Sequence, residues 1–161
     1  MIGMAGGPFS EIGLEPSDAP VNPAALEALQ QANIIVIGPG SLYTSILPNF
    51  MVPGFSAAVQ ASSAPKVFIC NIATQHGETD GMNASDHLNV FERHSEINVS
   101  HFLQNRRIQP IDAQYHQDPL EPTNEHLSQT VQVIQRDLID DAMLARHAPR
   151  KLAEAIIELA R

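Results

Sequence analysis

The chain has 161 residues, and 9 Lys plus Arg against 18 Asp plus Glu leave a formal charge of −9. This length predicts a single domain. An acidic chain with no basic cluster larger than a pair such as Arg106-Arg107 is unsuited to nucleic acid, whose phosphates need cations. One cysteine excludes an intrachain disulfide and favours a cytoplasmic location. No membrane span or signal peptide is recognisable, so we expect no membrane association.

The N-terminal part of the chain predicts irregular structure followed by a helix and a buried strand. Residues 1–13 are rich in glycine and are expected to be irregular or foreign to the domain. A helix is expected over 23–32, with Pro23 in its first turn, where the missing N–H costs nothing. Residues 33–38, NIIVIG, do not alternate apolar and polar side chains, which predicts a strand covered on both faces.

The remaining elements alternate between helices and strands. After a glycine turn, a helical stretch broken by Pro48 and Pro53 is expected, then a second helix. The order β-α-β-α-β-β-α is typical of an open α/β sheet. The later predicted elements are a helix over 54–63, a strand over 66–73, a helix over 84–94, strands over 97–105 and 130–139 separated by an extended excursion, and an amphipathic helix over 148–161.

The stretch IIVIGPGSLYTSILPN, residues 34–49, places glycines and hydroxyl side chains directly after the first strand. Ligands of open α/β sheets bind beyond the carboxyl ends of strands, where turns present free amides. Glycines without β-carbons would let an anion approach those amides. The stretch matches neither GxGxxG nor the P-loop pattern, so a tight turn with a capped helix is an equal alternative. The candidate phosphate-binding residues are Gly38, Gly40, Ser41, Leu42, Thr44 and Ser45.

A second polar cluster, TQHGETDGMNASDH, follows the second strand. Loops with so many different polar groups after a buried strand are typical binding sites. Glu78, Asp80 and Asp86 are hard oxygen ligands that could hold Mg²⁺ beside a phosphate. Two histidines in the cluster lack a third spaced ligand, which argues against structural zinc. The alternative is a solvated loop followed by a helix with an Asn83–Asp86 cap.

Other reactive residues have ordinary explanations. Cys70 lies inside an apolar strand, which favours a core position over a nucleophile. Ser41 lacks the GxSxG pattern, so a hydrolase triad is not indicated. Arg146 and His147 precede the last helix, where they either supply a cation to a phosphate or lie on the surface.

Three segments together resemble a known family. GPGSLYTS, TQHGETDGMNASDH and DLIDDAMLARHAPRKLAEAIIEL are similar to the YvcK-type gluconeogenesis factors, relatives of the 2-phospho-L-lactate transferase (CofD) of coenzyme F420 synthesis. The resemblance runs from about Leu14 to the C-terminus and is weakest around residues 97–130. It implies a CofD-like fold, which is Rossmann-like, with an open, mostly parallel sheet and flanking helices in three layers.

The resemblance also implies a ligand and a role. The YvcK-type members are associated with uridine-diphospho-sugars, gluconeogenic growth and cell-shape maintenance, so we expect a nucleotide-sugar-binding regulatory protein without turnover. The alternative is a transferase that moves a phospholactyl group from a guanosine-diphosphate carrier to a deazaflavin, with Mg²⁺ held by Glu78 and Asp80. No organic cofactor is implied. The residues that match the family's signatures are Thr74, Gln75, Glu78, Thr79, Asp80 and Arg146, with Tyr115 as a nucleotide-sugar contact.

The chain departs from the family pattern at its start. Family members begin with a strand and a GGGTG-type loop, which have no counterpart here, so residues 1–161 are expected to form one domain without the glycine-rich half. His76 stands where a proline is usual. A shortened sheet would leave an unpaired edge, which favours homo-oligomerisation. A third alternative is an inert fragment whose binding site is incomplete.

Overall fold

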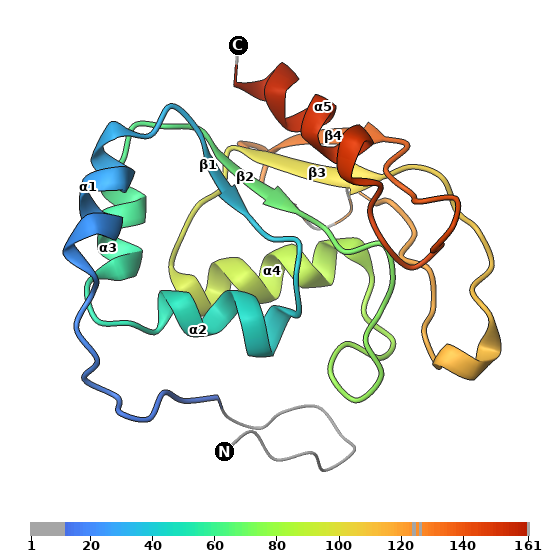
Figure 1. Ribbon diagram of the computed structural model, residues 1–161, viewed down its shortest axis with the longest axis horizontal. Helices are drawn as coiled ribbons and strands as arrows, with labels where there is room; N and C mark the ends of the chain where they lie inside the picture. Colours follow the sequence, from blue (N-terminus) through green and yellow to red (C-terminus); the bar gives the residue numbers. More distant parts are fainter. Residues whose placement is uncertain (1–11, 124, 126, 161) are drawn as a thin grey trace.

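Four short strands form one parallel sheet in the order β1-β2-β3-β4 (Figure 1). The computed structural model describes residues 12–123, 125 and 127–160, so most of the predicted irregular segment 1–13 lies outside the described residues. All three strand pairs are parallel, which confirms the predicted open α/β sheet. The strands are β1 (Ile35–Ile37), β2 (Lys66–Ile69), β3 (His101–Asn105) and β4 (Gln132–Arg136).

Helices occur where the sequence predicts them. Asn22 caps the first helix, and Asn83 with Asp86 forms the predicted capping box of α4. The helical segment after the glycine turn continues through Pro48, so the predicted break there is wrong; a π-helical turn passes directly into α2, with Pro48 in its first turn. The helices are α1 (Pro23–Gln31), η1 (Leu42–Ile46), α2 (Leu47–Phe50), α3 (Phe55–Ala61), α4 (Ala84–Ser95), η2 (Ala113–Tyr115) and α5 (Pro149–Leu159).

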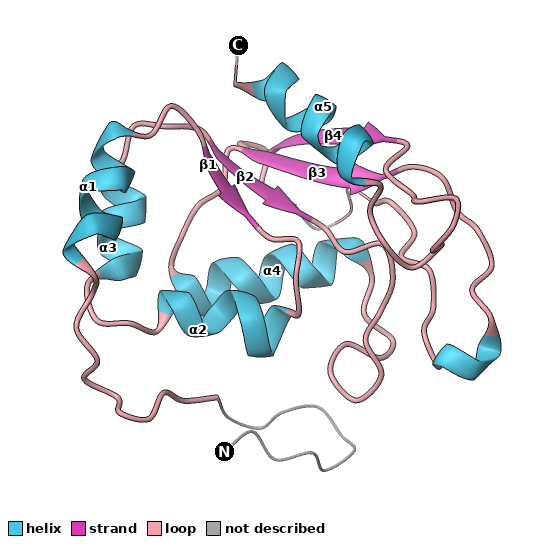
Figure 2. Ribbon diagram, viewed as in Figure 1, coloured by secondary structure: helices cyan, strands magenta, loops and turns pink. Residues whose placement is uncertain are grey.

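Helices cover both faces of the sheet, which confirms the three-layer architecture (Figure 2). On one face, the ring of Phe68 in β2 packs against that of Phe91 in α4, with 4.9 Å between the ring centroids. The ring of Phe102 in the neighbouring strand β3 lies 5.9 Å from that of Phe68. On the other face, side chains that alternate with these along the strands pack under α5. The central strands β2 and β3 are therefore buried on both sides, as the continuous apolar run of β2 predicts, whereas one face of β1 is exposed at Val36, so the predicted double cover of β1 is wrong.

The connection from β3 to β4 is the extended excursion that the sequence predicts. It contains the short helix η2, and Pro119 forms an isolated antiparallel bridge with Ala73. Leu120 is buried in the same core as α4, so the excursion returns over the face that α4 covers. Within the described residues no helix is long and apolar enough to cross a membrane.

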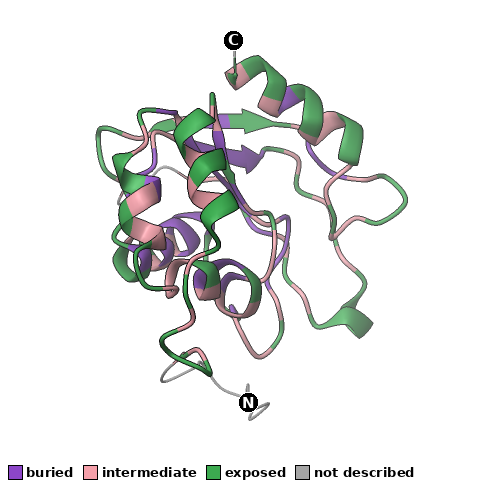
Figure 3. Ribbon diagram, turned by 60° about the vertical axis from the view of Figure 1, so that its left-hand side comes forward, coloured by how far each residue is buried: buried purple, intermediate pink, exposed green. Residues whose placement is uncertain are grey.

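Strand β1 forms one edge of the sheet (Figure 1), and the outer sides of the covering helices are exposed (Figure 3). Val36, on the α5 side, is 39% exposed because α5 packs over the other strands. On the opposite side a groove of about 400 Å³ runs beside β1, with Phe50, Phe55 and Val59 in its wall. Self-association through this edge stays a prediction.

Candidate functional site

A cavity of about 560 Å³ lies beyond the carboxyl ends of β1 and β2. This is the edge of a parallel sheet at which strand-to-helix turns present free backbone groups. The cavity brings together four residues that the sequence predicts as ligand-binding from three separate segments: Gly40, Ser41, Gln75 and Arg146. The other lining residues are Pro39, Asn71, Ile72, Ala73, Gln117, Ala145, His147, Pro149 and Leu152.

Two glycines of the turn, Gly38 and Gly40, differ in what a side chain there would meet. Gly38 has φ +83°, which L side chains rarely adopt, and a β-carbon there would lie 3.2 Å from Ile46 Cδ1 and from the carbonyl oxygen of Ile69. A β-carbon on Gly40 would face Ser45 and Ile46 at ordinary contact distances. The conformation and crowding at Gly38 therefore require glycine for the path of the chain, whereas the predicted role of Gly40 in leaving space for a ligand stays a prediction.

Asn71 holds the turn in place from the end of β2. Its Oδ1 accepts from Gly40 N at 3.3 Å, and its Nδ2 donates to the Gly40 carbonyl at 2.9 Å. This reciprocal pair ties the two strand ends together across 31 residues of sequence. The sequence does not single out Asn71 as a ligand-binding residue, although its position directly after a buried strand is a signal for such a role.

The turn itself leads into the helical segment 42–50. Ser41 caps it, since its Oγ accepts from Thr44 N at 3.2 Å. Within the described chain, the backbone N–H of Ser41, which lines the cavity, donates no hydrogen bond, so it remains open to an acceptor. The Leu42 side chain is buried in the core, and Ser45 lies in the wall of the groove beside β1, outside the cavity.

Two predicted phosphate ligands of the second loop, Thr74 and Thr79, are buried and hydrogen-bonded to the backbone. Thr74 is buried, its hydroxyl accepts from Asp118 N at 2.8 Å, and it anchors the β3–β4 excursion. Thr79 is also buried, and its hydroxyl accepts from Gln75 N at 2.8 Å, which closes the loop on itself. Gln75 lines the cavity, and its buried Oε1 has no hydrogen-bond partner in the described part of the chain.

The two acidic residues proposed for Mg²⁺ point to different partners. The Glu78 carboxylate accepts from Ser41 Oγ and from Thr44 Oγ1, the latter at 3.4 Å. Asp80 instead accepts from Gly77 N at 2.7 Å, and this hydrogen bond lowers its pKa. Among the described residues no group of three or more His, Cys, Asp or Glu side chains is placed to hold a metal. A Mg²⁺ site at Glu78 and Asp80 stays a prediction.

Arg146 supplies the positive charge of the cavity. Its side chain is exposed and makes no ion pair with any residue the structure describes. The neighbouring His147 is neutral, because burial lowers its pKa to about 4, and its Nε2 donates to the Cys70 carbonyl at 3.1 Å. Of the two residues predicted as cations, only Arg146 has that role. Cys70 is buried as predicted, and burial raises its pKa to about 12.

A second hollow of about 340 Å³ adjoins the cavity and shares Gln117, Ala145 and Arg146 with it. It lies between the β3–β4 excursion and the loop that precedes α5. Tyr115 and Met143 line it and are 60% and 50% exposed, respectively. Tyr115 thus lines the same hollow as Arg146, and its contact with a nucleotide-sugar stays a prediction.

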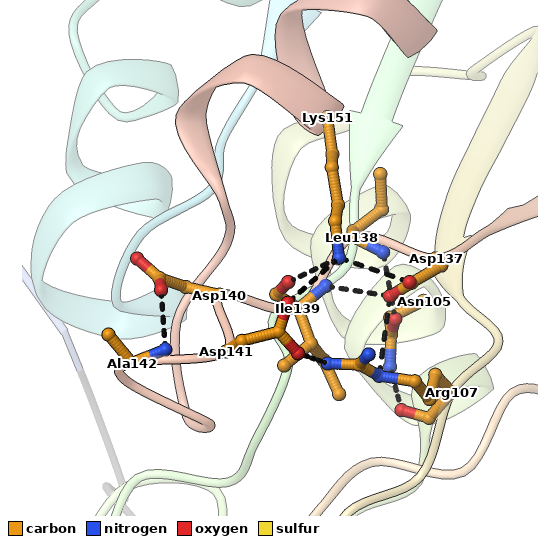
Figure 4. A network of polar contacts seen from close by, with 9 residues as sticks. All are labelled: Asn105, Arg107, Asp137, Leu138, Ile139, Asp140, Asp141, Ala142 and Lys151. Carbon is orange, nitrogen blue, oxygen red and sulfur yellow. Dashed lines mark hydrogen bonds and ion pairs between the residues drawn. The ribbon is translucent and has the colours of Figure 1, made fainter.

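An ion-pair network fixes the loop that carries Arg146 (Figure 4). Lys151 Nζ lies 3.0 Å from Asp137 Oδ2 and donates to the Ile139 carbonyl at 2.9 Å. Arg107 pairs with Asp137 at 3.5 Å and also with Asp141, which lowers the pKa of Asp141. The network joins the ends of β3 and β4 to the first turn of α5, and it holds the two loops around the second hollow.

These features define a Rossmann-like α/β protein with a polar cavity at the carboxyl edge of a parallel sheet. Residues 2–151 match the family model described as 2-phospho-L-lactate transferase CofD. The chain belongs to the CofD family.

Individual relatives share the fold and carry a more specific name. A gluconeogenesis factor of Halalkalibacterium halodurans is 38% identical over 98% of this chain and 51% of its own length. A gluconeogenesis factor of Listeria monocytogenes is 36% identical over 99% of this chain and 51% of its own. A crystal structure of a UPF0052 family protein from Bacillus halodurans matches with a TM-score of 0.85 at 38% identity, over 95% of this chain and 51% of that chain. This chain therefore spans about half the length of the relatives it matches.

Proposed function

We propose that this chain is the nucleotide-sugar-binding part of a regulatory protein of the gluconeogenesis factor type. The ligand is a UDP-sugar, and the protein acts in the cytoplasm, in carbon metabolism and in cell-wall and cell-shape maintenance, without turning its ligand over. The names of the relatives support the metabolic role. The choice of uridine and sugar rests on the sequence resemblance.

The observation that carries the proposal is the position of Arg146 between the two hollows. A diphosphate at this point would contact the guanidinium, which has no ion-pair partner among the described residues, on one side and the open N–H of Ser41 on the other. A charge-assisted hydrogen bond of this kind contributes about 1.5–3 kcal/mol. The turn needs no lysine because backbone amides supply the remaining positive potential.

The rest of the two hollows suits the uncharged parts of a nucleotide-sugar. Amide side chains of Asn71, Gln75 and Gln117 line the cavity, and the unpaired Gln75 Oε1 can accept from a sugar hydroxyl. Tyr115 offers an exposed ring beside Arg146, on which a base or sugar can stack. The diphosphate would then bridge the hollows, with one uncharged part in each.

Binding without turnover fits the titratable groups of the cavity wall. The wall contains no carboxylate among its lining residues. His147 has a pKa of about 4 and its Nε2 proton is held by the Cys70 carbonyl, so it is a weak base at neutral pH. A general base for phosphoryl transfer is therefore not supplied by the side chains that line this cavity.

The alternative is a 2-phospho-L-lactate transferase-like enzyme, and the description of the matching family model favours it. It would move a phospholactyl group from a guanosine-diphosphate carrier to a deazaflavin. Incubation of the chain with the carrier, the deazaflavin and Mg²⁺ distinguishes the two functions. Formation of the phospholactyl-deazaflavin product would establish the transferase and contradict our proposal.

Calorimetric titration with UDP-glucose tests the binding proposal. We expect Arg146→Gln to weaken binding by about tenfold or more, because a charge-assisted contact is lost. Arg150→Gln is the matched control, since Arg150 is exposed, pairs with Glu154 at 2.9 Å and lies outside the cavity lining. Equal affinities of the two variants, or no binding by the unmodified chain, would contradict the proposal.

A further inference from the structure

Glu78 joins the two sequence motifs of the site, and its contacts determine what the turn can offer a ligand. Its carboxylate accepts the hydroxyl proton of Ser41, and Thr44 Oγ1 lies 3.4 Å from the same carboxylate and contacts Ser41 Oγ; both hydroxyls were predicted to donate to a phosphate. Ser41 Oγ also accepts from Thr44 N. A hydroxyl has one proton, so a Ser41 hydroxyl that donates to Glu78 has none left for an anion in the cavity.

The loop that carries Glu78 holds it in this position. Thr79 accepts from Gln75 N at 2.8 Å and donates its own N–H to the Gln75 carbonyl at 2.9 Å. The Glu78 N–H donates to the same carbonyl at 3.0 Å. Glu78 forms no ion pair with the described residues, so no direct partner cancels its charge.

This charge lies directly behind the wall of the cavity. Ser41 lines the cavity while its hydroxyl contacts the Glu78 carboxylate. An anion that binds the open Ser41 N–H is separated from the carboxylate by two hydrogen bonds and the N-to-Oγ span of Ser41, a distance on the order of 6–8 Å. At that separation and partial burial, each further negative charge on the ligand is disfavoured appreciably.

We propose that Glu78 is a specificity-determining residue that selects the diphosphate diester of a nucleotide-sugar over a free nucleoside diphosphate. The inference rests on the proposed nucleotide-sugar function. A diphosphate diester carries a charge of about −2, whereas the terminal phosphate of a free nucleoside diphosphate loses a second proton near pH 6 and brings the total to about −3. The negative charge of Glu78 repels this extra charge, while the Ser41 N–H and Arg146 still bind the diester.

Calorimetric titrations of the unmodified chain and Glu78→Gln with UDP and with UDP-glucose test the proposal. Gln is isosteric and keeps an acceptor for Ser41 while it removes the charge. We expect UDP to bind about tenfold more tightly to the variant and UDP-glucose less than about threefold more tightly. Glu27→Gln changes the net charge equally on exposed α1 and should alter neither affinity. The same factor for both ligands, or weaker UDP binding, would overturn the proposal.

A ligand-side measurement avoids dependence on the folding of the variant. The β-methyl ester of UDP has the diester charge but no sugar, so we expect it to bind the unmodified chain more tightly than UDP does; tighter binding of UDP would overturn the inference. The failure of the proposed function gives a different pattern, namely no UDP-glucose binding by the unmodified chain. In that case a gain of UDP binding in Glu78→Gln still supports the inference, and no gain overturns it.

Discussion

Protonation of His147 is expected to destabilise the fold between pH 7.5 and pH 4.5. Burial lowers the pKa of His147 to about 4, and its Nε2 donates to the Cys70 carbonyl at 3.1 Å. In the unfolded chain the imidazole titrates at its ordinary value of about 6.5. Between these two values the unfolded state binds more protons than the folded state, so stability falls as the pH is lowered through this interval.

The size of the effect follows from the two pKa values. At pH 4.5 most unfolded molecules carry a protonated His147, whereas most folded molecules do not. Linkage over this interval gives a loss of ~2.5 kcal/mol relative to pH 7.5, at 1.36 kcal/mol for each pKa unit. Such a loss is a large fraction of the free energy of unfolding of a typical domain, which is about 5–15 kcal/mol.

Urea unfolding followed by circular dichroism measures this loss directly. His147→Gln keeps a donor for the Cys70 carbonyl but does not titrate, so the variant should lose ~2.5 kcal/mol less than the unmodified chain between pH 7.5 and 4.5. His87, whose pKa is also lowered by burial, is present in both proteins, and its contribution cancels. Parallel pH dependences of the two proteins would refute the reasoning.

Two substitutions elsewhere test the backbone and the ion-pair network. Gly38→Ala should lower the free energy of unfolding by about 2–3 kcal/mol, because φ is +83° and the β-carbon would meet Ile46 and Ile69 at 3.2 Å. Gly54→Ala, at φ +84° but with open space around the β-carbon, should lower it by about 1 kcal/mol. Equal shifts of the two melting temperatures would contradict the role of crowding at Gly38. In denaturant unfolding, Lys151→Met should lower the free energy of unfolding by about 1–2 kcal/mol, because Asp137 and the Ile139 carbonyl lose a donor. Arg150→Met, which removes an exposed ion pair, should lower it by less than about 0.5 kcal/mol. A larger loss in Arg150→Met than in Lys151→Met would contradict the role of the network.

The elements could be predicted because each has a local cause. Apolar runs that do not alternate predicted β1 and β2 as strands buried on both faces. All of β2 is buried, whereas Val36 leaves one face of β1 exposed because β1 lies at the edge of the sheet. The Asn83–Asp86 pair marked the start of α4 by its spacing alone. Pro48 misled because a proline in the first turn of a helix is tolerated, and the sequence did not show that α2 begins there.

The contents of the site were only partly predictable. The order of motifs placed Gly40, Ser41, Gln75 and Arg146 at one sheet edge, since parallel strands share their carboxyl edge. Whether a polar side chain faces the cavity or supports a loop depends on neighbours distant in sequence. The Thr74 hydroxyl accepts a hydrogen bond from the N–H of Asp118, 44 residues later in the chain, and no local pattern indicates that contact.

The strand-turn-helix units, and the edge of the sheet at which a ligand would bind, were predictable from the sequence alone, because periodicity and capping are local properties of the chain. The tertiary structure decided which side chains remain available there. Asn71 clamps Gly40 across 31 residues, and Glu78 takes the hydroxyl proton of Ser41 across 37. Those contacts depend on how the sheet aligns its strands, so the chemistry of the turn was settled by packing between distant segments.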